Sequence, residues 1–144
     1  MSSVNKSSPW RLDWNESLSV GVPEIDADHQ RFIRLVNELN QAIVARLGLE
    51  EIEKRMHAIL KVAKSDFTHE AAMFKQCGYP GAAEHSQKHA QMARVMNEIQ
   101  GRLERGCTEY ELIEAGLAVK EMLIDHLLNE DRKFLDWYRS TNPV

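Results

Sequence analysis

Residues 50–76, EEIEKRMHAILKVAKSDFTHEAAMFKQ, carry the clearest structural signal in this chain. Their apolar side chains recur at steps of three and four residues, which is the period of an amphipathic α-helix. These are Ile52, Met56, Ile59, Leu60, Ala63, Phe67, Met73 and Phe74. On a helical wheel, Glu70 falls in the middle of the apolar face and Asp66 falls at its edge. A carboxylate on a buried face needs a partner, so we expect a metal ion or a buried cation beside it.

Three other segments show the same helical period, and short breaks separate them. Gly48, Gly78-Tyr79-Pro80-Gly81 and Gly106 lie in these breaks, and Thr108 with Glu111 resembles a capping box that opens the last helix. Helices are expected at about residues 26–46, 50–76, 82–105 and 109–138. The pattern predicts an all-α fold, an up-down-up-down antiparallel four-helix bundle with an N-terminal extended arm at 1–25, as a single domain over 1–144.

Composition limits the classes of function. The 144 residues carry 18 basic and 22 acidic side chains, a net charge of −4, which argues against a nucleic-acid partner. The two cysteines, Cys77 and Cys107, form no CxxC motif and exclude a zinc ribbon or a disulfide framework. No segment has the apolar length of a membrane helix or a signal peptide, so we expect no membrane insertion and a cytoplasmic location.

Histidines and carboxylates on the other helices could share a site with Glu70. His85 and His89 lie four residues apart on one helix face and can reach one metal, although surface histidines often show this spacing too. His126 and Asp131 are five residues apart, about 140° around an α-helix, so they do not share a face but could hold a site from two sides. Alternatively, Asp131 belongs to an exposed charged run. His29 precedes an apolar stripe and points to the same interior, and inward groups of this kind build di-metal sites in helix bundles.

Taken together, these segments resemble a single-domain bacterial hemerythrin (bacteriohemerythrin) over about residues 10–138. The matching parts are Trp14, Val20-Gly21-Val22-x-x-Ile25-Asp26-x-x-His29-Gln30, Phe67-x-x-Glu70, Gly78-Tyr79-Pro80, His85-x-x-x-His89 and His126-x-x-x-x-Asp131. The resemblance implies a non-haem site of two iron ions with an oxo or hydroxo bridge, in which dioxygen binds at the second, open iron. It implies as ligands His85, His89 and His126 for one iron, His29 for the other, and Glu70 and Asp131 as bridges.

Asp66 departs from the family, whose His-Phe-x-x-Glu motif begins with histidine at this position. The spacing to Phe67 and Glu70 is intact, so this is a substitution and not a shift in register. As a ligand, Asp66 lowers the charge of the site by one unit. An anionic oxygen donor favours ferric over ferrous iron and suits harder metals, so we expect faster autoxidation and allow Mn at the Asp66 side. Because aspartate is shorter than histidine, the alternative is a water on that iron.

Two more histidines lie on the same helix. His69 follows Asp66 at a spacing that other di-iron bundles use for ligands, but the wheel puts it on the flank of the apolar face. Its alternatives are a substitute ligand for Asp66 or a residue outside the site. His57 falls on the solvent side and is interpreted as a surface residue.

The resemblance favours a dioxygen-binding protein for oxygen storage, transport or supply, with an oxygen-consuming enzyme as a client and no catalytic residues. A different class of function is an enzyme, a di-iron or Fe/Mn centre that consumes dioxygen, peroxide or nitric oxide, and Asp66 is the feature that suggests it. A third reading is a sensor whose helix packing responds to metal. The oligomeric state does not follow from the sequence.

Overall fold

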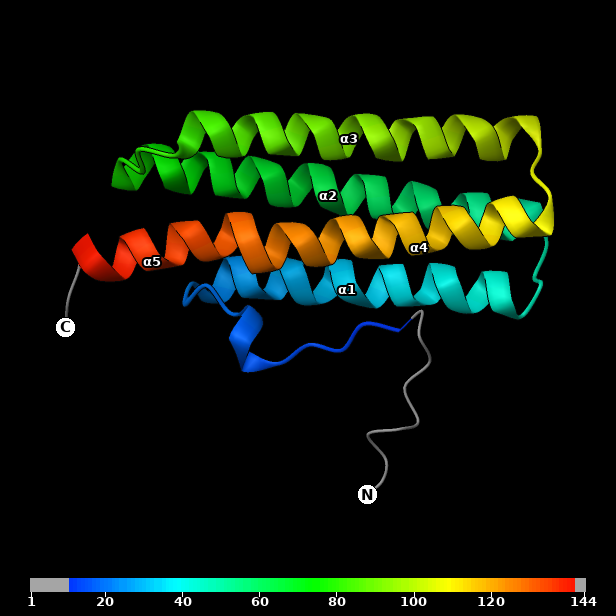
Figure 1. The fold of residues 1–144 in the computed structure, drawn as a ribbon, viewed down its shortest axis with the longest axis horizontal. Coiled ribbons are helices and arrows are strands. Elements are labelled where there is room, and N and C mark those ends of the chain that lie inside the picture. The colour runs from blue at the N-terminus through cyan, green and yellow to red at the C-terminus, as the bar shows by residue number, and fades with distance from the viewer. Residues whose placement is uncertain (1–10, 142–144) are drawn as a thin grey trace, which may run out of the picture.

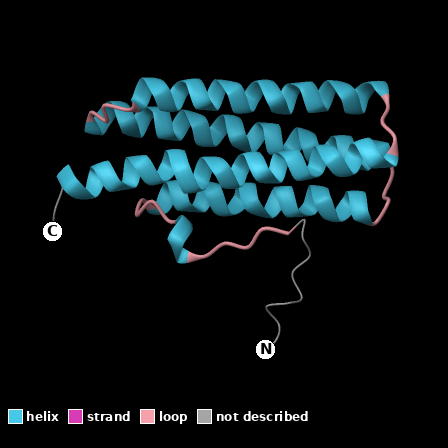
Figure 2. Ribbon diagram, in the orientation of Figure 1, coloured by secondary structure: helices cyan, strands magenta, loops and turns pink. Residues whose placement is uncertain are grey.

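The computed structural model describes residues 11–141, which form an antiparallel four-helix bundle and contain no β-strand (Figures 1 and 2). Helices α1 and α3 each pack against both α2 and α4, so neighbours in the chain are neighbours around the bundle. The predicted fold class is confirmed. The long helices are α1 (Pro23–Val44), α2 (Leu49–Cys77), α3 (Ala82–Arg105) and α4 (Glu109–Asp125).

The fourth rod of the bundle contains an irregular turn. Helix α4 runs into one π-helical turn, η3 (His126–Glu130), and then into α5 (Asp131–Thr141), which continues in the same direction (Figure 1). The backbone N–H of Asp131 donates to the carbonyl of His126, an i to i+5 bond that widens this turn. The sequence predicts an unbroken helix here, because the apolar period alone does not show an extra residue in one turn.

The helix ends follow local chemistry. Helix α1 begins at Pro23, before the predicted start at about residue 26, because proline suits a first helical position where its missing N–H is not needed. Helix α2 ends at Cys77, and Gly78 follows in the left-handed conformation with a φ of 72°. Helix α4 opens with the predicted capping box, in which Thr108 and Glu111 each bond to the other's backbone N–H.

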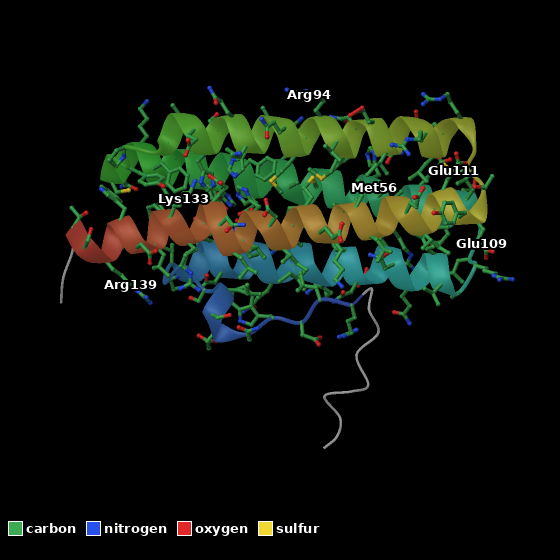
Figure 3. All side chains as sticks on the ribbon, in the orientation of Figure 1. Met56, Arg94, Glu109, Glu111, Lys133 and Arg139 are labelled. Atoms are coloured by element: carbon green, nitrogen blue, oxygen red, sulfur yellow. The ribbon has the colours of Figure 1, made fainter. Side chains whose placement is uncertain are left out.

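The interior changes from apolar to polar along the bundle. Figure 3 shows Met56 between the helices, and this residue is fully buried with apolar side chains from all four rods. Further along α2, the buried positions are occupied by Asp66 and Glu70. The opposite trend holds in α3, whose first buried residues are His85 and His89. The polar section therefore lies toward the end where α2 meets α3.

The N-terminal arm runs beside α1 (Figure 1). Leu12 exchanges two hydrogen bonds with the side-chain amide of Asn37, at 2.9 and 2.7 Å, and Leu18 and Val20 are buried. A single 3₁₀ turn, η2 (Glu16–Leu18), bends the arm toward the start of α1. Residues 1–10 of the predicted arm lie outside the described residues. Within 11–141, every helix is too short or too polar to cross a bilayer.

Candidate metal centre

Seven buried polar side chains converge where the interior becomes polar, and we call them the buried cluster. Each is at most 7% exposed. They come from every rod of the bundle: His29 on α1, Asp66 and Glu70 on α2, His85 and His89 on α3, His126 on η3 and Asp131 on α5. These are the seven candidates expected from the sequence, and the structure brings all of them together.

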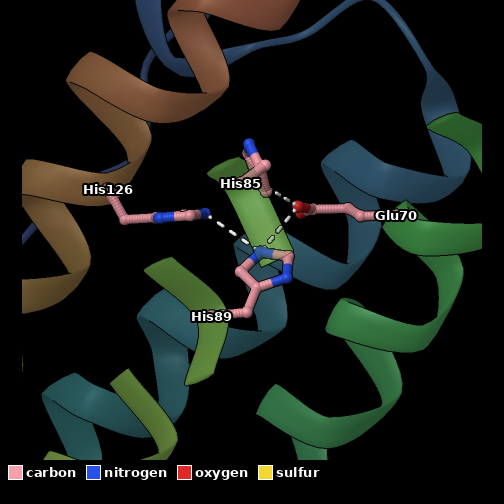
Figure 4. A group of neighbouring side chains, drawn as sticks. All are labelled: Glu70, His85, His89 and His126. Atoms are coloured by element: carbon pink, nitrogen blue, oxygen red, sulfur yellow. Dashed lines mark hydrogen bonds and ion pairs between the residues drawn. The ribbon is translucent and has the colours of Figure 1, made fainter. Parts of the chain in front are cut away.

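Three histidines form one half of the buried cluster (Figure 4). The Nε2 atoms of His89 and His126 lie 3.2 Å apart, and those of His85 and His89 lie 2.9 and 3.0 Å from Glu70 Oε1. Glu70 and these three histidines can each offer an atom within 4.8 Å of all the others. Such converging nitrogen and oxygen donors are suited to a transition-metal ion.

His29 and Asp66 form the other half. His29 Nε2 lies 2.6 Å from Glu70 Oε2, 3.2 Å from Asp66 Oδ2 and 3.5 Å from Asp131 Oδ2. His29, Asp66 and Glu70 form a second group of atoms that all lie within 4.8 Å of one another. This half has one imidazole and three carboxylates, so it is richer in oxygen than the three-histidine half.

Glu70 and Asp131 connect the two halves. Glu70 directs Oε1 to His85 and His89 and Oε2 to His29. Asp131 directs Oδ1 to His85 and His126, each at 3.2 Å, and Oδ2 towards His29. Each carboxylate thus divides its two oxygens between the two halves, which is how a carboxylate bridges a pair of metal ions.

The π-helical turn explains how His126 and Asp131 reach one site. In an α-helix residues five apart point in different directions, and the sequence analysis placed them about 140° apart on that basis. The i to i+5 bond between their backbones widens the turn and brings them to one face, where Asp131 Oδ1 lies 3.2 Å from His126 Nε2. The alternative that Asp131 is exposed is wrong, because the residue is 2% exposed.

Aromatic rings hold two imidazoles in place. Phe67 stacks on His89 with 3.9 Å between ring centroids and 11° between planes. Phe74 meets His85 edge to face at 4.7 Å. Phe74 also contacts Phe134 and Tyr79, which close this end of the bundle around the buried cluster. These contacts restrict the rotamers of the histidines and preorganise the site.

The pKa values of Asp66 and Glu70 shift in opposite directions. Burial raises the pKa of Asp66 to about 7, helped by the charges of Glu70 and Asp131 and opposed by the hydrogen bond with His29. Burial acts in the same direction on Glu70. There, hydrogen bonds from His29, His85 and His89 outweigh it and hold the pKa of Glu70 well below its usual range. Hydrogen bonding therefore favours the ionised form of Glu70.

The histidines respond to these carboxylates. Burial lowers the pKa of His85, but hydrogen bonds to Asp131 and Glu70 outweigh it and raise that pKa to about 9. For His29, burial also lowers the pKa, but hydrogen bonds to Asp66 and Glu70 outweigh it and raise the pKa well above its usual value. In the absence of a metal, protons on His29 and His85 thus help to balance the buried negative charge.

Several buried atoms of the cluster lack a hydrogen-bond partner among the described residues. They include Asp66 Oδ1, Asp131 Oδ2 and the Nδ1 atoms of His29 and His85. Buried polar atoms are rarely left unpaired, because each one costs free energy. Unpaired carboxylate oxygens next to converging imidazole nitrogens suit metal cations. The residues of the buried cluster therefore fit a metal centre.

The remaining histidines of α2 lie outside the buried cluster. His57 is exposed, as predicted. The side chain of His69 is 43% exposed, and its Nδ1 lies 2.6 Å from Oδ2 of Asp28. His69 thus pairs with Asp28 and is directed away from Asp66. Asp28 was not predicted from the sequence. Its one signal there is that Asp28 and His69 immediately precede His29 and Glu70.

Comparison with known proteins agrees with this site. Residues 20–138 match the Hemerythrin HHE cation binding domain family. The chain is similar to the bacteriohemerythrin of Stenotrophomonas maltophilia, with 25% identity over 127 residues that cover 87% of this chain and 80% of that protein. It is also similar to the bacteriohemerythrins of Pseudomonas aeruginosa, with 25% identity over 89% of this chain and 82% of that protein, and of Campylobacter jejuni, with 21% identity over 88% and 96%.

Proposed function

The chain belongs to the hemerythrin family, and on this premise we propose that it binds two iron ions with an oxo or hydroxo bridge and uses them to bind dioxygen. The proposed role is oxygen storage, transport or supply. The observation that carries the proposal is the division of the oxygens of Glu70 and Asp131 between the two halves of the buried cluster. A single metal ion needs no carboxylates in this arrangement, whereas a pair of ions does.

We assign the ligands by the halves they line. His85, His89 and His126 would hold one ion, and His29 with Asp66 would hold the other, while Glu70 and Asp131 would bridge them. Two ferrous ions bound in this way supply the electrons that reversible binding of dioxygen requires. The chain contributes the buried surroundings, which exclude water from this chemistry.

The number of protein donors in each half suggests which half would bind dioxygen. The three-histidine half has five protein donors when one oxygen from each bridge is included, whereas the half with His29 and Asp66 has four. The side of His29 and Asp66 would therefore leave its ion with fewer protein ligands than the three-histidine side. We therefore expect dioxygen to bind on the side of His29 and Asp66.

With Asp66, this protein is expected to lose its ferrous, oxygen-binding form faster than one with histidine at this position. The residue adds a third carboxylate to a buried site, and negative charge stabilises ferric over ferrous iron. Autoxidation should therefore be faster. The oxygen-rich half also suits Mn, since carboxylates are preferred ligands of that metal.

The same observation favours a second candidate function. A carboxylate-rich half would also suit a di-iron or Fe/Mn enzyme that consumes dioxygen, peroxide or nitric oxide instead of releasing it. Turnover distinguishes the two functions: a carrier consumes no more peroxide or nitric oxide than free iron does. For the carrier we propose a cytoplasmic location and an oxygen-consuming enzyme as the client.

Anaerobic loading with ferrous iron tests the proposal. The protein should retain about two iron ions per chain, and an absorption band should appear when air is admitted and disappear when oxygen is removed. A conversion that does not reverse, together with consumption of peroxide or nitric oxide faster than by free iron, supports the second candidate. Retention of fewer than about two ions, with no change in absorption on exposure to oxygen, contradicts both.

A further inference from the structure

A groove between α2 and α3 lies outside the buried cluster, and we call it the basic groove. Its volume is about 530 Å³, which is in the range of small-molecule sites. Its apolar surface comes from Leu60, Ala63 and Phe67 on α2 and from Ala93 and Met96 on α3. None of the described residues that line it belongs to the buried cluster, so a ligand could occupy it without contacting the proposed metal ligands.

Three basic residues border the groove on the side of α2. His57, Lys61 and Lys64 follow one another at steps of four and three residues, so they share one face of the helix. All three are exposed. A lysine in such a position lays its alkyl chain along the apolar surface and keeps its ammonium group in water. The positive charges therefore lie at the mouth of the groove and the apolar side chains lie deeper.

The two lysines have no acidic neighbour to neutralise them. Elsewhere on α2, Lys54 and Arg55 form ion pairs with Glu51. Within residues 11–141, neither Lys61 nor Lys64 has a carboxylate partner, and no acidic residue is among those that line the groove. The chain as a whole has a net charge of −4, so its charge here is opposite to its overall charge. This local positive charge favours an anion.

We propose that the basic groove binds an alkyl carboxylate, a carboxylate head with a single unbranched apolar chain. The head lies at Lys61 and Lys64, and the chain lies against the apolar residues of α2 and α3. The lining residues of α2 extend from residue 57 to residue 67, which is about 15 Å of helix and leaves room for a chain of about eight carbons.

A small molecule fits this groove better than a protein does. A stable protein interface buries about 800 Å² on each partner, which needs a much larger surface than a groove of this volume. An apolar molecule without a charge would leave the lysines unpaired, and an inorganic anion would leave the apolar surface wet. The inference goes beyond the proposed metal function and does not depend on it.

Two substitutions in α3 provide a matched test of the apolar part. Ala93 lines the groove, so Ala93→Phe fills it. Ala90 is exposed on the same helix and is not among the lining residues, so Ala90→Phe adds the same ring without filling the groove. Asn97→Phe fills the groove from an exposed position and serves if Ala93→Phe folds poorly.

A second pair of variants tests the charge. Lys61→Met combined with Lys64→Met keeps much of the apolar bulk of both side chains and removes both ammonium groups. Lys54→Met combined with Lys75→Met removes the same charge from exposed positions of α2 that do not line the groove. The comparison separates a local effect of the two lysines from the effect of net charge.

The experiment is calorimetric titration of sodium octanoate into iron-loaded protein, with octylammonium chloride and 1-octanol as ligands of matched chain length. Octanoate should bind about tenfold more tightly than octylammonium. Ala93→Phe, or Asn97→Phe, should weaken octanoate binding about tenfold, and Ala90→Phe should leave it within about twofold. The first lysine pair should weaken the binding of octanoate about tenfold but not that of octanol, and the second pair should change neither.

Four results would overturn the inference. They are no saturable binding of octanoate, equal affinity for octanoate and octylammonium, unchanged octanoate binding in a folded variant that fills the groove, and equal effects of the two lysine pairs. The third result would place the anion elsewhere, including at the metals. Iron is counted before each titration, so failure to retain iron contradicts the proposed function, and the four results decide separately on the groove.

Discussion

Asp66 lies directly against His29, with 3.2 Å between Oδ2 and Nε2, and both residues are 1% exposed. A buried carboxylate at this position gives one half of the cluster three acidic side chains and one imidazole. We expect this contact to influence how the site behaves towards oxygen.

Asp66→His should slow autoxidation by about tenfold, because removing one negative charge makes ferric iron less favourable and a tenfold change needs only about 1.4 kcal/mol in the barrier. The rate is measured from the absorption of the oxygen-exposed protein over time. Asp136→His makes the same substitution at an exposed position of α5 and should change nothing. Equal rates in wild type and Asp66→His would show that Asp66 does not control oxidation.

His69 should be dispensable for metal binding. Its side chain pairs with Asp28 and is largely exposed, so His69→Gln should retain about two metal ions per chain. His29→Gln removes the only imidazole of its half and should lose one of the two ions. Metal counting by mass spectrometry checks both variants. Loss of an ion from His69→Gln would identify His69 as a ligand and contradict the assignment to Asp66.

Gly116→Ala should destabilise the bundle by about 1–3 kcal/mol, the usual cost of overpacking. A Cβ at this position would lie 2.2 Å from Oδ1 of Asn40, whose amide donates to the Gly116 carbonyl across α1 and α4. Urea unfolding measures the change. As a control, Gly101→Ala meets only the flexible end of Arg105 at 3.4 Å and should be neutral or stabilising, since alanine favours helix. Equal stability of wild type and Gly116→Ala would disprove the close packing of these two helices.

Thr108→Ala should cost about 1 kcal/mol of stability, because it leaves the first turn of α4 without its side-chain cap. Thr68→Ala provides the comparison, since Thr68 is exposed within α2 and its hydroxyl only returns to the carbonyl of Lys64. That variant should stay within about 0.5 kcal/mol of wild type. Similar losses in the two variants would mean that the cap is not what stabilises the helix.

Much of the fold and the cluster could be predicted from the sequence. The three- and four-residue period gave the helices, and Glu70 in the middle of an apolar face already required a buried partner. The convergence of His29, His85 and His89 followed once the helices were antiparallel neighbours. These features depend on regular helical geometry, which sequence spacing describes well.

Other features depend on irregular geometry or on contacts between helices. The relation between His126 and Asp131 could not be predicted, because it requires a π turn that no periodic pattern indicates. The pairing of Asp28 with His69 depends on how α1 and α2 face each other beside the cluster. A cavity between α2 and α3 is lined by Ala71 and Ala83 among others, and sequence spacing alone does not give its position.

Anomalous diffraction from crystals of the iron-loaded protein tests most directly whether Glu70 and Asp131 bridge two metal ions. We expect two iron peaks, one among His85, His89 and His126 and the other beside His29 and Asp66, with both carboxylates between them. A single peak, or a second peak that does not contact Asp66, would contradict it.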